Sequence, residues 1–187
     1  MNQSDSSDLA PALDTVAWIN TLEPLILSEL KGKVVVIHAF QMLCPGCVAH
    51  GIPQATTIHN LYAKEDVQVI GLHTVFEHHE VMTIDALKVF VEEYRITFPI
   101  AIDTPSDSEF IPKTMASYQM RGTPTLIVLD KSSRVRLNHF GSISDMQVGS
   151  LIGSLLVEPS DFSVTDENDD SVDHINVEKC RNDGCST

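Results

Sequence analysis

Two kinds of hydrophobic pattern follow one another along the chain and predict alternating strands and helices. Continuous apolar, mostly β-branched runs over residues 33–40 and 67–73 have the length of strands that are buried on both faces. Between them, apolar residues recur every three to four positions, which predicts a helix from Cys44 to about Tyr62, bent near Pro53. A strand, a helix and a second strand in this order indicate a βαβ unit with parallel strands.

The second half of the chain continues this alternation and ends its sheet with a hairpin. Thr83 is expected to open a helix with one apolar face, and residues 98–103 form a short strand. A helix over about residues 111–120 leads to a strand at 125–129, and residues 134–140 have the pattern of its antiparallel partner. The pattern therefore predicts an α/β protein with a mixed sheet.

The last periodic segment and the local composition set the expected limits of the domain. Ser144 is expected to cap a helix that ends the core near Val157. Residues 1–12 are polar and without periodicity, which predicts a flexible N-terminal arm before a single domain over residues 13–157. Residues 158–187 hold nine acidic and two basic residues and few large apolar ones, which predicts a disordered acidic tail.

Charge and hydropathy exclude several classes of partner. The net charge of −14 opposes binding to nucleic acid and to anionic membranes, so neither is expected as a partner. No apolar run approaches the roughly 20 residues that span a bilayer, which predicts a soluble protein. The first residues lack the basic and apolar parts of a secretory signal, so we expect a cytoplasmic location.

The motif Cys44-Pro45-Gly46-Cys47 lies between the first predicted strand and its helix. A spacing of three residues in the first helical turn places both sulfurs on one side, so they can form a disulfide. Cys44 is expected at the N-cap and Pro45 at the first helical position, where a fixed φ and a missing donor do no harm. The free N–H groups and the helix dipole at this end lower the pKa of the Cys44 thiol. Cys44 is therefore the predicted nucleophile and Cys47 the resolving cysteine, with Pro45 and Gly46 tuning the dithiol pKa.

A second cysteine pair, Cys180 and Cys185, lies in the predicted tail. Two interpretations stay open for it: a second dithiol that exchanges with the first pair, or thiols without a function. A zinc site would need two ligand pairs at ordered spacing, with the tail pair as the candidate second pair. The redox interpretation is favoured, and neither a metal nor another cofactor is expected.

The CPGC motif with its flanking strand and helix, together with the segment GTPT at residues 122–125, resembles the thioredoxin superfamily over about residues 13–157. The segments GLHTVFE and FPIAID are similar to its TlpA-like branch. The resemblance implies a thioredoxin-like fold, a central mixed β-sheet flanked by helices, with an N-terminal extension and an insert after the βαβ unit. It also implies that Pro124 follows a cis peptide bond and packs against the dithiol, while the backbone at Thr123 pairs with substrate as an added strand.

Three positions depart from the pattern of that superfamily. Leu43 stands where an aromatic residue is usual, His38 where thioredoxins have a buried acid, and His50 where some TlpA-like proteins have glutamate. Because imidazole titrates near neutrality, His38 or His50 could relay a proton to or from Cys47. A structural role for His38 and a surface role for His50 remain alternatives. Most members of the branch are exported or membrane-anchored, so their partners are not carried over.

The sequence therefore predicts a thiol-disulfide oxidoreductase that exchanges its dithiol with disulfides of protein or small thiol substrates, in the reductive direction if the protein is cytosolic. A thiol reductase or glutathione is the expected electron donor. One alternative is a thiol-dependent peroxidase similar to peroxiredoxins, although FQMLC lacks the proline and threonine that those enzymes place before their cysteine. The other alternative is a non-catalytic module that binds a metal or partner through its histidines and tail cysteines.

Overall fold

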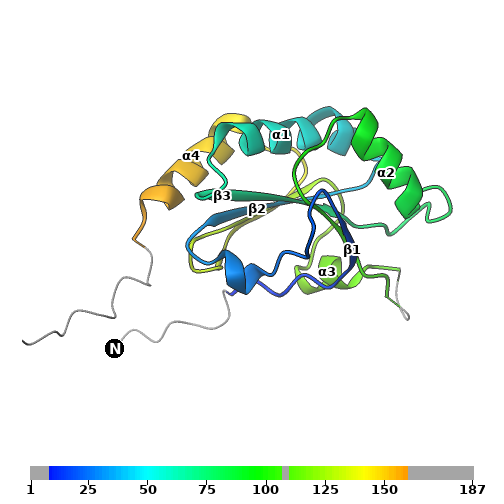
Figure 1. Ribbon diagram of the computed structural model, residues 1–187, viewed down its shortest axis with the longest axis horizontal. Helices are drawn as coiled ribbons and strands as arrows, with labels where there is room; N and C mark the ends of the chain where they lie inside the picture. Colours follow the sequence, from blue (N-terminus) through cyan, green and yellow to red (C-terminus); the bar gives the residue numbers. More distant parts are fainter. Residues whose placement is uncertain (1–8, 107–109, 160–187) are drawn as a thin grey trace, which may run out of the picture.

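A six-stranded mixed sheet forms the centre of the computed structural model, which describes residues 9–106 and 110–159 (Figure 1). The strand order is β1-β4-β3-β2-β5-β6. Strands β2, β3 and β4 are parallel to one another, and β1, β5 and β6 are antiparallel to their neighbours. The strands are β1 (Thr15–Ile19), β2 (Val34–Phe40), β3 (Val67–His73), β4 (Ile100–Asp103), β5 (Thr125–Leu129) and β6 (Val135–Phe140).

Helices cover both faces of the sheet (Figure 1). Strand β2 is buried at all seven of its positions because its side chains enter two cores in alternation. Val36 and Phe40 contact the core under α1, α2 and α4, whereas Val35 and Ile37 contact the core under α3. The helical elements are η2 (Leu27–Leu30), the π-helical η3 (Cys47–Gly51), α1 (Ile52–Leu61), α2 (Ile84–Glu93), α3 (Lys113–Ser117) and α4 (Asp145–Val157).

The predicted fold class is confirmed, including the βαβ unit. Strands β2 and β3 are parallel, with Val34 opposite Val67 and Phe40 opposite His73. After β3, α2 and β4 extend the sheet by a third parallel strand, which is the insert expected between the βαβ unit and the hairpin. Thr83 and Ser144 cap α2 and α4 through their side chains, as their positions before the apolar periodicities predict.

The predicted helix after the dithiol contains an irregular turn just before Pro53, near which a bend was expected. Helical structure begins at Pro45, widens into η3, and continues as α1 from Ile52. The amide of Ile52 bonds to the carbonyl of Cys47, five residues back, so the wide turn precedes Pro53. Because proline has no N–H to give to a regular helical bond, the irregularity falls just before it.

The ordered N-terminal part is longer than the sequence indicates. Leu9 forms an isolated bridge with Arg134, the amide of Ala10 donates to the carbonyl of Ser133, and the Tyr118 hydroxyl donates to the carbonyl of Pro11. The predicted arm over residues 1–12 is therefore packed from Leu9 onwards. Strand β1, which the hydrophobic pattern does not reveal, pairs antiparallel with β4. Residues 1–8 and 160–187 lie outside the described residues.

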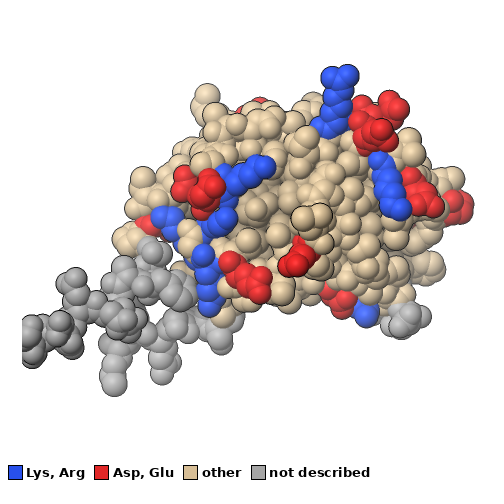
Figure 2. Space-filling view, in the orientation of Figure 1, with Lys and Arg blue, Asp and Glu red and all other residues tan. Residues whose placement is uncertain are grey.

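Helix α3 is shorter than the predicted 111–120. It begins after Pro112 and ends at Ser117, and Gln119, two residues later, adopts a left-handed φ of 52° that cannot continue a right-handed helix. Among the helices of the described residues, none combines the length and the apolar character needed to cross a bilayer. On the face shown in Figure 2, basic and acidic side chains lie next to each other at both ends, with mostly uncharged residues between them.

The wide turn η3 brings Gly51 against the ring of His38, a buried residue of β2. A Cβ atom built on Gly51 would lie 1.9 Å from Nε2 of His38. We expect Gly51→Ala to lower the free energy of unfolding by about 2 kcal/mol, because the enclosed ring must shift to admit the methyl group. Urea denaturation followed by circular dichroism measures this change.

Gly153 of α4 is the matched control, because a Cβ there meets nothing within 4 Å. Gly153→Ala should raise the stability by about 0.5–1 kcal/mol through helix propensity alone. Equal effects of the two substitutions would show that the Gly51 contact with His38 carries no strain.

Candidate active site: a dithiol at a helix N-terminus

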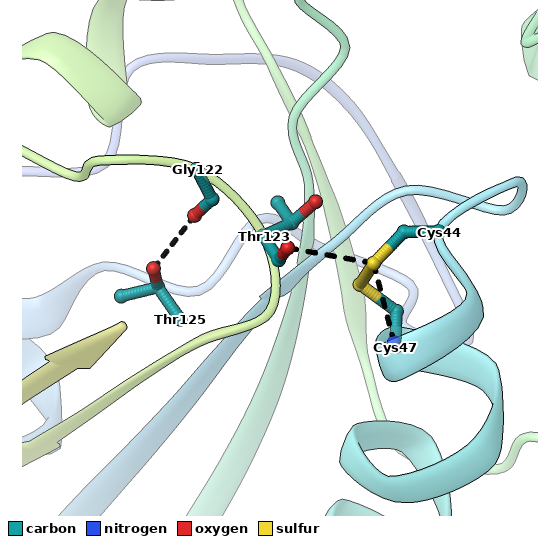
Figure 3. Close-up of a disulfide and its surroundings, with 5 residues drawn as sticks. All are labelled: Cys44, Cys47, Gly122, Thr123 and Thr125. Carbon is teal, nitrogen blue, oxygen red and sulfur yellow. Dashed lines mark hydrogen bonds between the residues drawn. A yellow bond between two sulfur atoms is a disulfide. The ribbon is translucent and has the colours of Figure 1, made fainter. Parts of the chain in front are cut away.

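Cys44 and Cys47 form a disulfide across the first turn of the helix that follows β2 (Figure 3). Their Cα atoms are 5.2 Å apart. The amide of Cys47 lies 3.2 Å from Sγ of Cys44, and the amide of Val48 donates to the carbonyl of Cys44. Cys44 thus occupies the N-cap predicted for it, with its sulfur in the place of a capping oxygen.

The two sulfurs differ in access to solvent. Cys47 is fully buried and contributes to the core under α1, whereas Cys44 is partly exposed. Leu43, just before the dithiol, exposes 58% of its surface, so the approach to Cys44 is apolar. An external thiolate or disulfide can therefore reach Cys44 but not Cys47.

The loop before β5 lies against the dithiol (Figure 3). The Thr123–Pro124 peptide bond is cis, and the carbonyl oxygen of Thr123 lies 3.5 Å from Sγ of Cys44. A Cβ built on Gly46 would lie 3.2 Å from Cδ of Pro124, so the glycine of the CPGC motif allows this close approach. The structure thus brings together Cys44, Gly46, Thr123 and Pro124, which are predicted site residues.

Two hydrogen bonds hold this loop. The Thr125 hydroxyl, which is fully buried, donates to the carbonyl of Gly122 at 2.7 Å. The amide of Gly141, after β6, donates to the carbonyl of Pro124 at 2.8 Å. The carbonyl of Pro124 is thus bonded to the residue that follows β6, whereas the carbonyl of Thr123 faces the dithiol.

His38 lies beneath the helix turn and is 2% exposed. Burial lowers its pKa to about 4. Neither ring nitrogen reaches hydrogen-bonding geometry with any described residue. His38 is therefore neutral at pH 7, and its ring packs on Gly51, four residues beyond Cys47.

The predicted site residue His50 is exposed on η3, on the rim of a cavity of about 360 Å³. His38 and Gly51 also line this cavity, which lies between the start of α1 and the β6–α4 connection. The structure thus places both predicted histidines at one cavity behind the dithiol, His38 inside the protein and His50 at the surface.

Sequence reasoning missed two neighbours of the site, Phe140 and Arg121. Phe140, at the end of β6, lies against Gly122, where a Cβ would be 2.8 Å from its ring. The guanidinium of Arg121 lies 5.6 Å from the centre of the same ring. The glycine-before-threonine pattern at residues 122–123 gave a signal for Gly122, but no local pattern links Phe140 to this loop.

Cys180 and Cys185 lie outside the described residues. His73 is buried at the end of β3 against Phe40, with ring centres 5.3 Å apart. Over residues 9–106 and 110–159, no group of three or more His, Cys, Asp or Glu side chains is arranged to hold a metal ion.

Comparison with known families and structures agrees with this geometry. The Redoxin family matches residues 5–149 of the chain. A crystal structure of a thiol-disulfide isomerase from Corynebacterium glutamicum is 52% identical, with a TM-score of 0.77, and covers 80% of this chain and 98% of that one.

Curated relatives share a similar segment. The thiol-disulfide oxidoreductase ResA of Halalkalibacterium halodurans is 25% identical over 67% of this chain and 64% of its own length. NHL repeat-containing protein 2 of Homo sapiens is 30% identical over 60% of this chain and 15% of its own length. The chain thus spans less than two thirds of either relative.

The buried histidines make stability depend on pH. The pKa of His38 and of His73 falls through burial from 6.5 to about 4, so the unfolded chain binds protons more strongly between these values. The contribution of each neutral histidine to the free energy of unfolding is therefore fully present above about pH 6.5. As the pH falls towards 4, this contribution decreases by about 3 kcal/mol for each of the two residues. His38→Leu should halve this loss because His73 remains, and urea unfolding at pH 4.5 and 7 measures it. An unchanged pH dependence in His38→Leu would contradict the neutral, buried state of the ring.

Proposed function

The chain belongs to the Redoxin family, within the TlpA-like branch of the thioredoxin superfamily, and from this we propose that its Cys44–Cys47 dithiol exchanges electrons with disulfides of protein or small thiol substrates. The observation that carries the proposal is the asymmetry of the pair, with one sulfur accessible and the other buried behind it. Thiol-disulfide exchange by two cysteines needs such an order of attack.

In the reductive direction, the Cys44 thiolate attacks one sulfur of a substrate disulfide. A bond forms between Cys44 and that sulfur, and the second substrate sulfur leaves as a thiolate, which takes up a proton. Cys47 then loses its proton and attacks Sγ of Cys44, which breaks the mixed disulfide and releases the reduced substrate. Two electrons have then passed to the substrate, and the Cys44–Cys47 disulfide remains.

The helix end favours the attacking form of Cys44. The Cys47 amide at 3.2 Å and the free N–H groups of the first turn stabilise negative charge on its sulfur. The substrate is held by the loop opposite: Thr123 presents its backbone to an extended substrate segment, and Pro124 keeps that backbone against the dithiol.

His38 is the proposed acceptor of the Cys47 proton. A neutral imidazole can accept a proton, and this ring lies against Gly51 on the same helix as Cys47. Burial lowers the pKa of this ring to about 4, which makes it a poor base that holds the proton only in passing, and the cavity that it lines together with His50 leads to solvent.

The proposed net direction is reductive in a reducing compartment such as the cytosol, with a thiol reductase or glutathione as electron donor. We expect a reduction potential near the thioredoxin value of about −270 mV. Equilibration of the dithiol with glutathione buffers, followed by mass spectrometry of alkylated protein, measures it. A value of about −120 mV, that of a strong oxidant, would instead indicate that the protein oxidises thiols to disulfides.

Substitution of each cysteine separates their roles. Cys44→Ser should abolish reduction of insulin disulfides, because Cys47 is buried and cannot attack in its place. Cys47→Ser should also stop turnover but retain substrates as stable mixed disulfides on Cys44, which non-reducing electrophoresis and mass spectrometry detect.

His50→Gln should keep turnover within about twofold of the unmodified protein, because His50 is exposed and is not proposed to take the Cys47 proton. Insulin reduction that persists in Cys44→Ser would refute the proposed function.

A further inference from the structure

A groove of about 730 Å³ lies along the edge strand β6, between that strand and the segment after α3. Its apolar lining includes Leu9 and Val135 at one end and Tyr118 and Phe140 further along. Phe140 is opposite Thr125 in the sheet, and Thr125 directly follows Pro124. The groove therefore extends along β6 towards the loop that contacts the dithiol.

The charge of this groove differs from that of the whole chain. Arg121 lies over the exposed ring of Phe140 at the end near the dithiol. The described residues that line the groove include no acid, although the chain carries 26 acidic residues and a net charge of −14. An occupant with apolar side chains and negative charge is therefore complementary to it.

The chain itself contains a segment of this character that ends in a cysteine. Residues 172–180 read VDHINVEKC, with apolar Val172, Ile175 and Val177, two acids and one lysine, so the segment keeps a net negative charge. The described chain ends at Pro159, and Glu158 pairs with Arg136 of β6. The chain thus leaves the domain beside the strand along which the groove extends.

The length of the chain is sufficient for this segment to reach the dithiol. Cys180 follows Pro159 by 21 positions, which can span up to about 70 Å, whereas the six residues of β6 span about 20 Å. Covalent attachment also gives a tethered thiol an effective concentration on the order of millimolar.

We propose that the segment ending in Cys180 binds in the groove beside β6 and delivers Cys180 to Cys44, so that the Cys180–Cys185 pair exchanges electrons with the Cys44–Cys47 pair. This inference rests on the proposed function of the dithiol. The chain then supplies a substrate-like segment of its own, and the tail pair is the point at which electrons from an external thiol enter.

The exchange balances without a further reactant. The Cys180 thiolate attacks Sγ of Cys44, the accessible sulfur, which forms a mixed disulfide and releases the Cys47 thiolate to take up a proton. Cys185 loses its proton and attacks Sγ of Cys180, which breaks the mixed disulfide and releases Cys44 as a thiolate. Two electrons pass from the tail to the CPGC pair, and a thiol such as glutathione reduces the tail disulfide afterwards.

The test uses the full-length chain with Cys185→Ser, which removes the resolving tail thiol. The oxidised protein is equilibrated in a glutathione buffer, quenched with acid, alkylated and mapped by mass spectrometry. We expect an intramolecular Cys44–Cys180 disulfide, at least about threefold more abundant than the Cys44–Cys185 disulfide of the matched variant Cys180→Ser.

Charge reversal tests the groove. Arg121→Glu should lower the Cys44–Cys180 population roughly threefold or more, because the attraction of Arg121 for the acids of the segment, Asp173 and Glu178, becomes a repulsion. Lys88→Glu makes the same change of charge on α2, outside the lining of the groove, and should leave the population unchanged.

Three results would overturn the proposal: equal amounts of mixed disulfide in Cys185→Ser and Cys180→Ser, equal effects of Arg121→Glu and Lys88→Glu, or a disulfide that links two chains, which would identify a second copy as the occupant. Insulin reduction by the same preparations separates the two proposals. Activity that depends on Cys44 without a Cys44–Cys180 disulfide removes only this inference, whereas activity independent of Cys44 removes the proposed function.

Discussion

The contact between the first turn of a helix and the loop before β5 is the constraint on which the site depends. Strands β2 and β5 are antiparallel neighbours, with Ala39 opposite Thr125, so the end of one and the start of the other lie at the same edge of the sheet. The dithiol follows the first strand, and Pro124 precedes the second. Cys44 and Thr123, 79 positions apart in the sequence, therefore lie close together, and the sheet register, not the loops alone, holds the Cys44 sulfur against the backbone of Thr123.

The same register explains why one cysteine is accessible and the other is not. Cys44 caps the helix at the rim of the sheet, whereas Cys47 has turned into the core under α1. Stepwise disulfide exchange has two requirements. One is a helix N-terminus that stabilises the attacking thiolate, and the other is a second, buried cysteine close enough to resolve the mixed disulfide. Both follow from one helical turn placed at the end of a buried strand.

Much of this arrangement could be predicted from sequence because it is local or periodic. The buried strands β2 and β3 show as continuous apolar runs, and the CPGC motif predicts its own cap geometry. The rest depends on tertiary contacts. β1 is a short edge strand whose partner lies far along the chain, and the wide turn at η3 depends on the fit of Gly51 against His38, which no spacing records. The packing of Phe140 against the loop before β5 follows from sheet pairing and likewise could not be predicted from the sequence.

The fit between Gly122 and Phe140 has a consequence for how this protein can change over time. The backbone at position 122 approaches the ring so closely that a methyl group would meet it at 2.8 Å. A larger residue at position 122 would meet both this ring and a φ of 156° that L side chains rarely adopt, so a smaller side chain at position 140 would remove only one of the two obstacles. Glycine is therefore expected to persist at position 122 even where position 140 at the edge of the sheet diverges, so the backbone that faces the dithiol changes more slowly than the strand beside it.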